Sequence, residues 1–381
     1  MLDSRWCRTV KFYQTGGDDT LRRGSGYTYP MGIFRKSKRL ALGIDIGSAS
    51  VKVLELSTAG KGFKANRAGV EPLPKNAIVE HRINDLRLIS DAVRRAVSHS
   101  RSSRKKVVVS VPQTHVITRT INLPAGLAER EIEEQVMIEA AQQIPHSLDE
   151  VNLDFEVSGG ARDGSDDQVT ITACRKEIVE DYAAVMELAG LKAMIVDVGL
   201  SAVERGYGFV AQTLGDSLEG RAIALMDFGD VTTRLDLFVD GRSIYGREQN
   251  FGGRILTENV RSRYGIDYRE AEALKRGGDL PQNYGQDLLE PFRQAMAREA
   301  ARSVEFCLSA QLGMDRVDAL VISGGCVQIE GIAALIESHV GVPTVLADPF
   351  GSGSAIKADK LVARYGPSMI KAAGLAVRGA R

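Results

Sequence analysis

Two distant stretches of the chain place an acid, a glycine and hydroxyl residues in the same order. "DIGSASVKVLEL" begins at Asp45, and "DFGDVTTRLDLF" begins at Asp227. When the two acids are aligned, the glycines also coincide. Apolar residues alternate on both sides of each bend, which is the pattern of a β-hairpin. A turn alone requires only the glycine, so the acids predict that two similar hairpins point into one cleft.

These residue types favour the binding of a phosphate together with its metal ion. Backbone amides at the turns can donate hydrogen bonds to phosphate oxygens, and serine and threonine hydroxyls can add others. Magnesium prefers few carboxylates and several waters, so Asp45 and Asp227 are the predicted metal-binding residues. The predicted phosphate-binding residues of the two hairpins are Gly47, Ser48, Ser50, Lys52, Gly229, Thr232 and Thr233.

A third element follows the second hairpin. The stretch "ALVISGGCVQIEGIAALIESHV" has an apolar strand, the pair Gly324 and Gly325, and a helix that opens near Gly331. Glycines at such a bend allow the backbone to approach a ligand closely, and the helix start is electropositive. Taken singly, each of these elements is more often a turn or a packing feature. Two matched hairpins followed by the glycine bend favour a nucleotide-binding cleft.

Composition excludes several classes of protein. The chain has 381 residues, of which 44% are hydrophobic, and this suits two or more packed domains. Basic and acidic residues each number 49, but residues 1–40 hold nine basic and three acidic ones, which leaves 40 basic against 46 acidic. The remainder therefore lacks the basic excess typical of nucleic-acid binding. The four cysteines are far apart without a CxxC pair, so neither a disulfide framework nor a zinc site is predicted.

The elements that must position these residues alternate between strands and helices. The patterns predict a helix at 85–100, a buried strand at 107–111, a helix at 176–190 and a strand at 192–199. No apolar run reaches the ~18 residues of a membrane-spanning helix.

A compact α+β insert is predicted between the strand at 107–111 and the helix at 176–190. It contains an amphipathic helix at 128–145, in which apolar residues recur at fourfold spacing, and two antiparallel strands at 151–157 and 168–175. The predicted organisation is a flexible lead-in at 1–38, a first lobe at 39–111 and 176–210, the insert at 112–175, and a second lobe at 211–381.

Longer phrases carry a family resemblance. With "ITRTINLPAGLAEREIEEQVMIEAAQQIPHSLDEVNLDFEV" and "DGRSIYGREQNFGGRILTENVRSRYGIDYREAEALK", the sequence resembles the actin-like ATPase superfamily and, within it, the PilM family of type IV pilus assembly proteins. The resemblance runs from about residue 31 to the C-terminus. It implies an α/β actin-like ATPase fold, in which two duplicated lobes surround a nucleotide cleft and an α+β insert of the type shared by FtsA and PilM is added. Family members commonly begin near Met31, so residues 1–30 are expected to precede the usual start.

The resemblance also implies a cofactor, ATP with Mg²⁺, and further site residues. The glycine pairs Gly252–Gly253 and Gly324–Gly325 would flank the nucleotide. Glu272 and Lys275, three residues apart on one helix face, would reach the ribose or adenine. The alternative for this last pair is an ordinary surface salt bridge.

Two positions depart from the family pattern. Gly199 stands where relatives often have an acidic or polar side chain near the attacking water, so hydrolysis is expected to be slow and no catalytic residue is assigned. Asp230 follows the second turn glycine, where it would either assist metal binding or repel the γ-phosphate. The sequence leaves these two roles of Asp230 open.

The implied function is a cytoplasmic ATP-binding scaffold of the type IV pilus inner-membrane platform. Its implied partner is the cytoplasmic tail of PilN, bound at the insert, and pilus motor ATPases and platform proteins are further candidates. The resemblance implies no nucleic acid and no direct membrane insertion, so attachment to the inner membrane would come through partners.

The alternatives are an FtsA-like filament-forming ATPase and a sugar-kinase-like enzyme. The first would end in an amphipathic membrane helix, for which "AVRGAR" is too short. The second would need a base for an acceptor hydroxyl, and no segment matches one.

Overall fold

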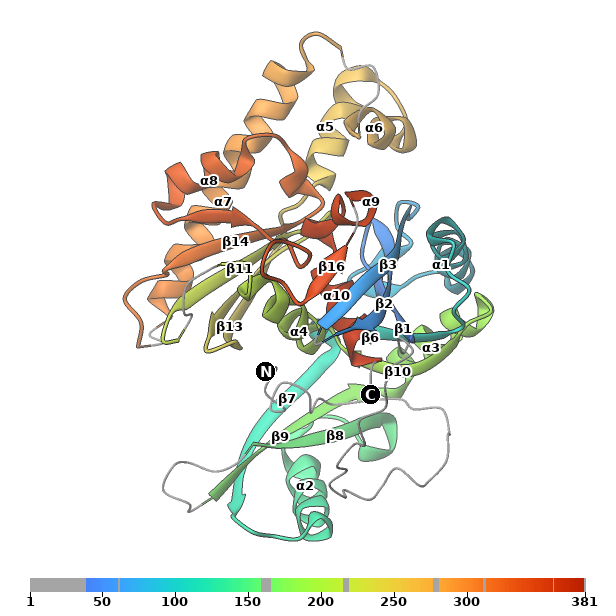
Figure 1. Cartoon of the computed structure of the whole chain (residues 1–381), viewed down its shortest axis with the longest axis vertical. Coiled ribbons are helices and arrows are strands. Elements are labelled where there is room, and N and C mark those ends of the chain that lie inside the picture. Colours follow the sequence, from blue (N-terminus) through green and yellow to red (C-terminus); the bar gives the residue numbers. More distant parts are fainter. Residues whose placement is uncertain are drawn as a thin grey trace.

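The computed structural model describes residues 39–60, 62–158, 166–214, 219–276, 281–310, 313–358 and 360–379 (Figure 1). The lead-in predicted at 1–38 lies outside these described residues. Within them, none of the helices combines the length and the apolar composition needed to cross a bilayer.

Two large sheets repeat the same strand order. The first sheet runs β10-β6-β1-β2-β3-β16, and the second runs β13-β12-β11-β14-β15. Each therefore has an antiparallel three-strand meander with two parallel strands added beside its first strand. The strands of the first sheet are β1 (Arg39–Ile46), β2 (Ser50–Ala59), β3 (Gly62–Pro72), β6 (Lys106–Val111), β10 (Lys192–Val198) and β16 (Ile356–Ala358). Those of the second are β11 (Ala222–Phe228), β12 (Thr233–Val239), β13 (Arg242–Gln249), β14 (Ala319–Gly324) and β15 (Thr344–Leu346).

The strand register confirms the duplication that the sequence predicts. Asp45 is the cross-strand partner of Lys52 in the β1–β2 hairpin, and Asp227 is the partner of Arg234 in the β11–β12 hairpin. The aligned residues therefore occupy equivalent places in two hairpins of the same geometry.

Helices cover both faces of the first sheet because its strands alternate. Along β2, Val51 and Val53 pack with α1 (Leu86–Ser100) and α3 (Lys176–Leu188). Leu54 and Leu56, which point to the other face, pack with α10 (Ile370–Arg378). Val107 to Val109 of β6 are fully buried, as expected for a central strand.

The second sheet packs on helices of both lobes. One face packs with α7 (Glu290–Ser309) and α8 (Ile332–Val340), and α5 (Arg254–Tyr264) and α6 (Tyr268–Lys275) contribute Leu256, Val260 and Ala271 to the same core. The other face packs on α4 (Gly199–Ala211), where Tyr207 stacks on Phe238 with ring centroids 4.0 Å apart. In Figure 1, α4 and α10 accordingly lie between the two sheets.

The C-terminal segment returns to the first sheet. Strand β16 pairs in parallel with β3, and α9 (Lys360–Ala363) and α10 follow it. Helix α10 then packs on α4 and β1. The expected second-lobe range of 211–381 therefore includes a segment that belongs to the first sheet, because hydrophobic periodicity identifies an element without saying which sheet it joins.

The insert is a three-stranded sheet with one helix. Its strands are β7 (Val116–Pro124), β8 (Val151–Ser158) and β9 (Asp166–Arg175), in the order β7-β9-β8. Helix α2 (Glu129–Gln143) buries Ile132, Val136 and Ala140, as the fourfold spacing predicts. Strand β7 was not predicted, because its first half is mostly exposed and polar. In Figure 1 the insert projects from the first lobe at the bottom of the view.

Candidate functional site

The two hairpin turns close with the same hydrogen bond. The Gly47 amide donates to the Ser50 carbonyl at 3.0 Å, and the Gly229 amide donates to the Thr232 carbonyl at 3.0 Å. A Cβ atom at Gly229 would lie 2.7 Å from that carbonyl, so a glycine is required there. Four amides at the tips of the turns have no hydrogen-bond acceptor among the described residues: those of Ser48, Ala49, Asp230 and Val231.

Asp45 is buried, and its carboxylate contacts the ammonium groups of two lysines. Its Oδ2 accepts from Lys52 Nζ at 3.0 Å, and its Oδ1 lies 3.4 Å from Lys371 Nζ. Burial acts to raise the pKa of Asp45, but the charges and hydrogen bonds of Lys371 and Lys52 outweigh it and bring the pKa down to about 2. The carboxylate is therefore ionised, and each of its oxygens faces an ammonium group.

Lys371 reaches Asp45 because α10 lies directly on β1. A Cβ atom at Gly43 would lie 2.2 Å from the Ala372 carbonyl oxygen, so only glycine permits this crossing. Lys371 precedes Ala372 in α10, and Asp45 follows Gly43 by two residues in β1. The crossing therefore places Lys371 beside Asp45. Sequence reasoning missed Lys371, because no local pattern links a residue near the C-terminus to the first hairpin.

The second hairpin uses its residues differently. Arg234 does not pair with its cross-strand partner Asp227; it makes two bonds to Asp236, Nη2 to Oδ1 at 2.6 Å and Nε to Oδ2 at 2.9 Å. Asp227 is exposed and accepts from the Ser323 hydroxyl at 2.9 Å. Asp227 is therefore the more open of the two aspartates.

The two predicted threonines have different roles. Thr233 is only 1% exposed, and its hydroxyl donates to the Phe251 carbonyl at 2.8 Å. This hydroxyl is already used, so Thr233 holds the loop before α5. Thr232 is partly exposed at the turn, and its side chain hydrogen-bonds to Glu248.

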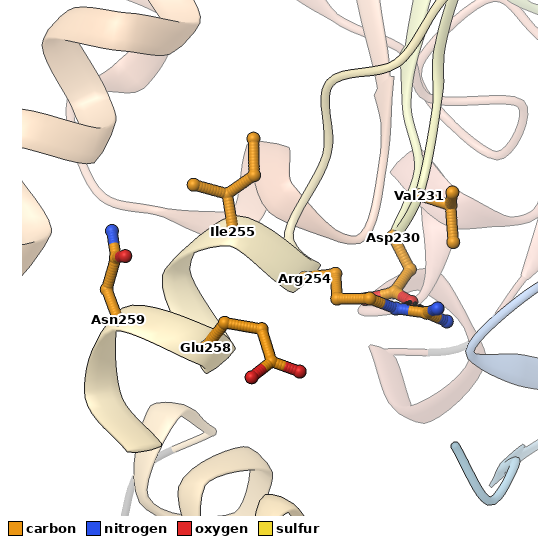
Figure 2. A pocket seen from close by; sticks show the side chains of 6 residues that line it. All are labelled: Asp230, Val231, Arg254, Ile255, Glu258 and Asn259. Carbon is orange, nitrogen blue, oxygen red and sulfur yellow. Dashed lines mark hydrogen bonds and ion pairs between the residues drawn. The ribbon is translucent and has the colours of Figure 1, made fainter. Parts of the chain in front are cut away.

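The Gly252–Gly253 pair lies on the second turn. The Gly253 amide donates to the Gly229 carbonyl at 3.0 Å, and a Cβ atom at Gly252 would lie 2.4 Å from the Asp230 carbonyl oxygen. The Asp230 carboxylate pairs with Arg254, the first residue of α5, with Nη2 2.8 Å from Oδ2. Asp230 thus fastens the start of α5 to the turn (Figure 2), a role different from the two that the sequence left open.

The glycine bend after β14 also contacts this region. Gly324 has a φ of 100°, and a Cβ atom there would lie 2.3 Å from the Phe228 carbonyl oxygen. Helix α8 begins at Ile332 after Gly331, close to the predicted start. Gly325 has open space where a side chain would stand. The Cys326 thiol that follows donates to the Gly229 carbonyl at 3.5 Å, and burial raises its pKa to about 12.

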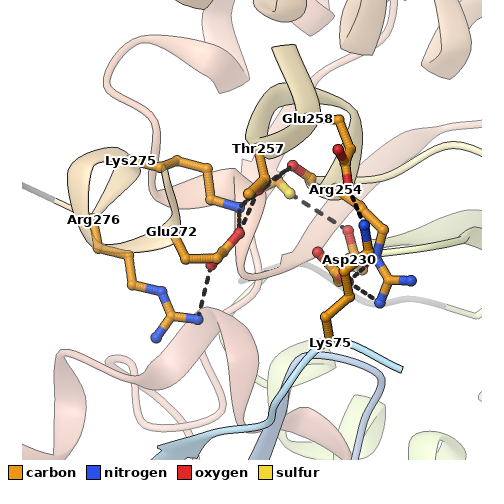
Figure 3. A network of polar contacts seen from close by, with 11 residues as sticks. Lys75, Asp230, Arg254, Thr257, Glu258, Glu272, Lys275 and Arg276 are labelled. Carbon is orange, nitrogen blue, oxygen red and sulfur yellow. Dashed lines mark hydrogen bonds and ion pairs between the residues drawn. The ribbon is translucent and has the colours of Figure 1, made fainter. Parts of the chain in front are cut away.

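Glu272 and Lys275 form a network with α5 (Figure 3). Lys275 Nζ donates to Glu272, to the Thr257 hydroxyl at 2.7 Å and to the Gly253 carbonyl at 3.4 Å, and Thr257 donates to Glu272. The two charged side chains are 16% and 18% exposed. Burial raises the pKa of Glu272, but Lys275 and the hydrogen bonds lower it overall. The pair is therefore not an ordinary surface salt bridge.

Two ion pairs connect the lobes. Lys75 Nζ lies 2.6 Å from Glu258 Oε1 on α5, and His81 Nε2 lies 2.8 Å from Glu248 Oε1 on β13. Glu80 and His81 form the two-residue turn between β4 (Ile78–Val79) and β5 (Arg82–Ile83), with φ values of 48° and 62°. The hydrogen bond to Glu248 raises the pKa of His81.

Two pockets lie near these groups. The first, of about 330 Å³, runs along α5 beside the second turn and contains neither Asp45 nor Asp227 (Figure 2). The second, of about 370 Å³, lies where the insert meets the first lobe. Its lining includes Arg82, Thr114, His115, His146, Cys174 and Arg175.

The charged groups fit a phosphate better than they fit a magnesium ion held by both aspartates. No group of three or more metal-ligating side chains occurs among the residues that the structure describes. Asp227 is open to a hydrated ion, but both oxygens of Asp45 face lysines. The geometry therefore does not favour Asp45 as a ligand of magnesium.

The duplicated sheets, the paired hairpins and the helices between them define an actin-like ATPase fold. Within that class, the chain belongs to the family of the type IV pilus assembly protein PilM, whose sequence profile matches residues 43–380. One chain of a PilM-PilN type IV pilus biogenesis complex has 25% sequence identity and a TM-score of 0.69, and the match covers 90% of this chain and 98% of that one. Ethanolamine utilization protein EutJ from Carboxydothermus hydrogenoformans matches at 13% identity with a TM-score of 0.53, over 91% and 92% of the two chains, which is a likeness of fold.

Proposed function

We propose that the protein is an ATP-binding scaffold of the type IV pilus assembly platform that binds the cytoplasmic tail of PilN. The observation that carries the nucleotide half is the pair of matched turns. Each turn is closed by the same glycine amide bond, and each leaves two tip amides without an acceptor in the described part of the chain. Amides of this kind are suited to phosphate oxygens.

The remaining groups support a nucleotide in the same cleft. Ser48 and Ser50 add hydroxyls at the first turn, and Lys52, which pairs with Asp45, adds a positive charge beside it. The Gly324–Gly325 bend and the Gly252–Gly253 loop both lie against the second turn, where backbone can approach a ligand closely. Glu272 and Lys275 are proposed to contact the ribose or adenine, at the far side of that loop.

Titration calorimetry with ATP and ADP tests the nucleotide half. Lys275→Met should weaken ATP binding at least about tenfold, because it removes a charge-assisted donor. Arg269→Met is the matched control on the same helix, since Arg269 is exposed. Failure of the wild-type protein to bind either nucleotide would refute this half of the proposal.

The partner half is supported by the match to a chain of the PilM-PilN complex and by the pocket at the insert. That pocket combines Arg82 and Arg175 with apolar side chains such as Ile117 and Ile178, so it offers both polar and apolar contacts to a docked segment. We assign it as the docking site of the PilN tail. The protein would then associate with the inner membrane from the cytoplasm, through this partner.

Hydrogen exchange with a PilN tail peptide tests the partner half. Thr114→Arg, an exposed position in the pocket, should reduce peptide binding while sparing ATP binding. Thr118→Arg is the matched control, because Thr118 is also exposed, on β7, but does not line the pocket. Protection confined to residues beyond 220 would contradict the assignment.

ATP hydrolysis is proposed to be slow. Gly199 begins α4 directly after β10, and it offers no side chain to orient an attacking water. A turnover below ~1 s⁻¹, the lower end of the range for typical enzymes, is expected in a phosphate-release assay. Fast turnover without a partner would contradict this reading of Gly199.

A further inference from the structure

Lys371 places a positive charge beside Asp45 of the first hairpin. Its Nζ lies 3.4 Å from Asp45 Oδ1, and its side chain is one-third exposed. Asp227 also stabilises the charged form of Lys371, which places this ammonium within electrostatic range of both hairpins. The sequence predicts a magnesium ion for this position.

The charges around Lys371 balance without a metal ion. Lys52 pairs with Asp45, and Arg234 pairs with Asp236. Asp227 has no ionic partner at contact distance among the described residues, and it hydrogen-bonds to a neutral hydroxyl. With Lys371 there are three cations and three carboxylates among these six groups, so these six carry no net charge.

The fold fixes the backbone of Lys371 in this position. The Ala372 carbonyl rests against Gly43 of β1, and the Ile370 carbonyl rests against Gly206 of α4, so that α10 is held on both sides. The ammonium can turn from Asp45 toward a phosphate by side-chain rotation, while the helix stays in place. A divalent ion bound to Asp45 would have to displace this ammonium or stand beside it, and like charges a few ångströms apart repel strongly.

We propose that Lys371 supplies the charge that a divalent cation would otherwise supply beside Asp45. The protein then binds the nucleotide phosphates without a requirement for Mg²⁺, and Mg²⁺ alone does not bind at Asp45. The phosphate part of this inference rests on the proposed nucleotide function. The exclusion of Mg²⁺ from Asp45 rests only on the positions of Lys52 and Lys371 beside that carboxylate.

The experiment compares the wild-type protein with Lys371→Met and Lys371→Arg, each in EDTA and in MgCl₂. The control is Lys357→Met, an exposed lysine on β16. The first readout is the melting temperature without nucleotide. Mg²⁺ should leave the wild type, Lys371→Arg and the control unchanged, and should raise the melting temperature of Lys371→Met, in which the aspartates have lost a cation.

The second readout is ATP affinity by titration calorimetry. Removing Mg²⁺ should weaken ATP binding by less than about tenfold in the wild type and by about a hundredfold or more in Lys371→Met. The loss of affinity in the two proteins should thus differ by at least tenfold, which corresponds to about 1.4 kcal/mol of binding free energy. Lys371→Arg should behave like the wild type, because it keeps the charge.

The outcomes separate the two proposals. A melting temperature of the wild type that rises with Mg²⁺ as much as that of Lys371→Met would overturn the role of Lys371. Loss of wild-type ATP binding in EDTA would also overturn the role of Lys371, but the proposed nucleotide function would then stand. If no variant binds ATP in either buffer, the nucleotide function fails, and the melting readout still decides whether Lys371 excludes the metal.

Discussion

Replacing Gly206 by alanine should destabilise the protein through the contact between α4 and α10. A Cβ atom at Gly206 would lie 2.0 Å from the Ile370 carbonyl oxygen and 2.7 Å from Ile370 Cγ2. Carbon and oxygen cannot approach this closely, so the two helices must move apart. Forcing additional atoms into a well-packed contact typically costs about 1–3 kcal/mol and occasionally more.

Gly208→Ala provides the matched control on the same helix. No atom lies within 4 Å of a Cβ placed at Gly208. Alanine is favoured over glycine in a helix interior by roughly 0.5–1 kcal/mol, and both variants gain this. The difference between the two variants therefore equals the packing cost, about 1–3 kcal/mol, with Gly208→Ala at or above the wild type.

The assay is thermal and urea unfolding, followed by hydrogen exchange of α10. Gly206→Ala should melt below the wild type, and its α10 amides should exchange faster, since Ile370 begins that helix. Gly208→Ala should leave this exchange unchanged. If Gly206→Ala melts at the same temperature as Gly208→Ala, the helices do not meet as closely as described, and the positioning of Lys371 by this crossing is refuted.

Three other predictions concern buried or paired groups. The hydrogen bond between His81 and Glu248 raises the pKa of His81 above 6.5 and lowers the pKa of Glu248 below 4.5. The stability that this pair contributes is therefore lost as pH rises through the raised pKa of His81, and also as pH falls through the lowered pKa of Glu248. The melting difference between wild type and His81→Gln should thus peak between pH 4.5 and 6.5 and fade at alkaline pH, staying within ~1 kcal/mol because both groups are partly exposed. Cys326, whose pKa burial raises to about 12, should react with a thiol reagent at pH 8 far more slowly in the folded than in the denatured protein. Asp197→Ala should cost roughly 3–5 kcal/mol in a urea titration, because Asp197 and Arg205 form a buried ion pair.

The duplicated hairpins could be predicted because their signal is local and repeated. Each hairpin has its own alternation and its own glycine, and the shared order of acid, glycine and hydroxyl residues gives the alignment. The cross-strand register agrees with that alignment, because Asp45 lies opposite Lys52 and Asp227 lies opposite Arg234. Helix α2 was predictable for a similar reason, since its apolar stripe is needed to cover a sheet.

The electrostatics of the cleft could not be predicted in the same way. Lys52 and Arg234 occupy aligned positions, and the alignment implies equal roles for them. In the structure, however, Lys52 forms an ion pair with Asp45, whereas Arg234 forms one with Asp236. Lys371 comes from a helix that crosses into the first lobe from the far end of the chain, and only the contact at Gly43 reveals its position. Strand β3 was also missed, because its side chains are mixed in character and only its register with β2 defines it.

The segment from Lys75 to Arg82 connects the two proposed binding sites. On one side it contacts the second lobe, through Lys75 with Glu258 and His81 with Glu248, and Glu248 in turn hydrogen-bonds to Thr232 at the second turn. On the other side Arg82, the residue after His81, lines the insert pocket together with His115. The segment that carries both inter-lobe ion pairs thus also supplies Arg82 to the wall of the pocket. Coupling between binding sites is reciprocal, so nucleotide and PilN tail should each change the affinity of the other by the same factor, and breaking the His81–Glu248 pair should reduce that factor.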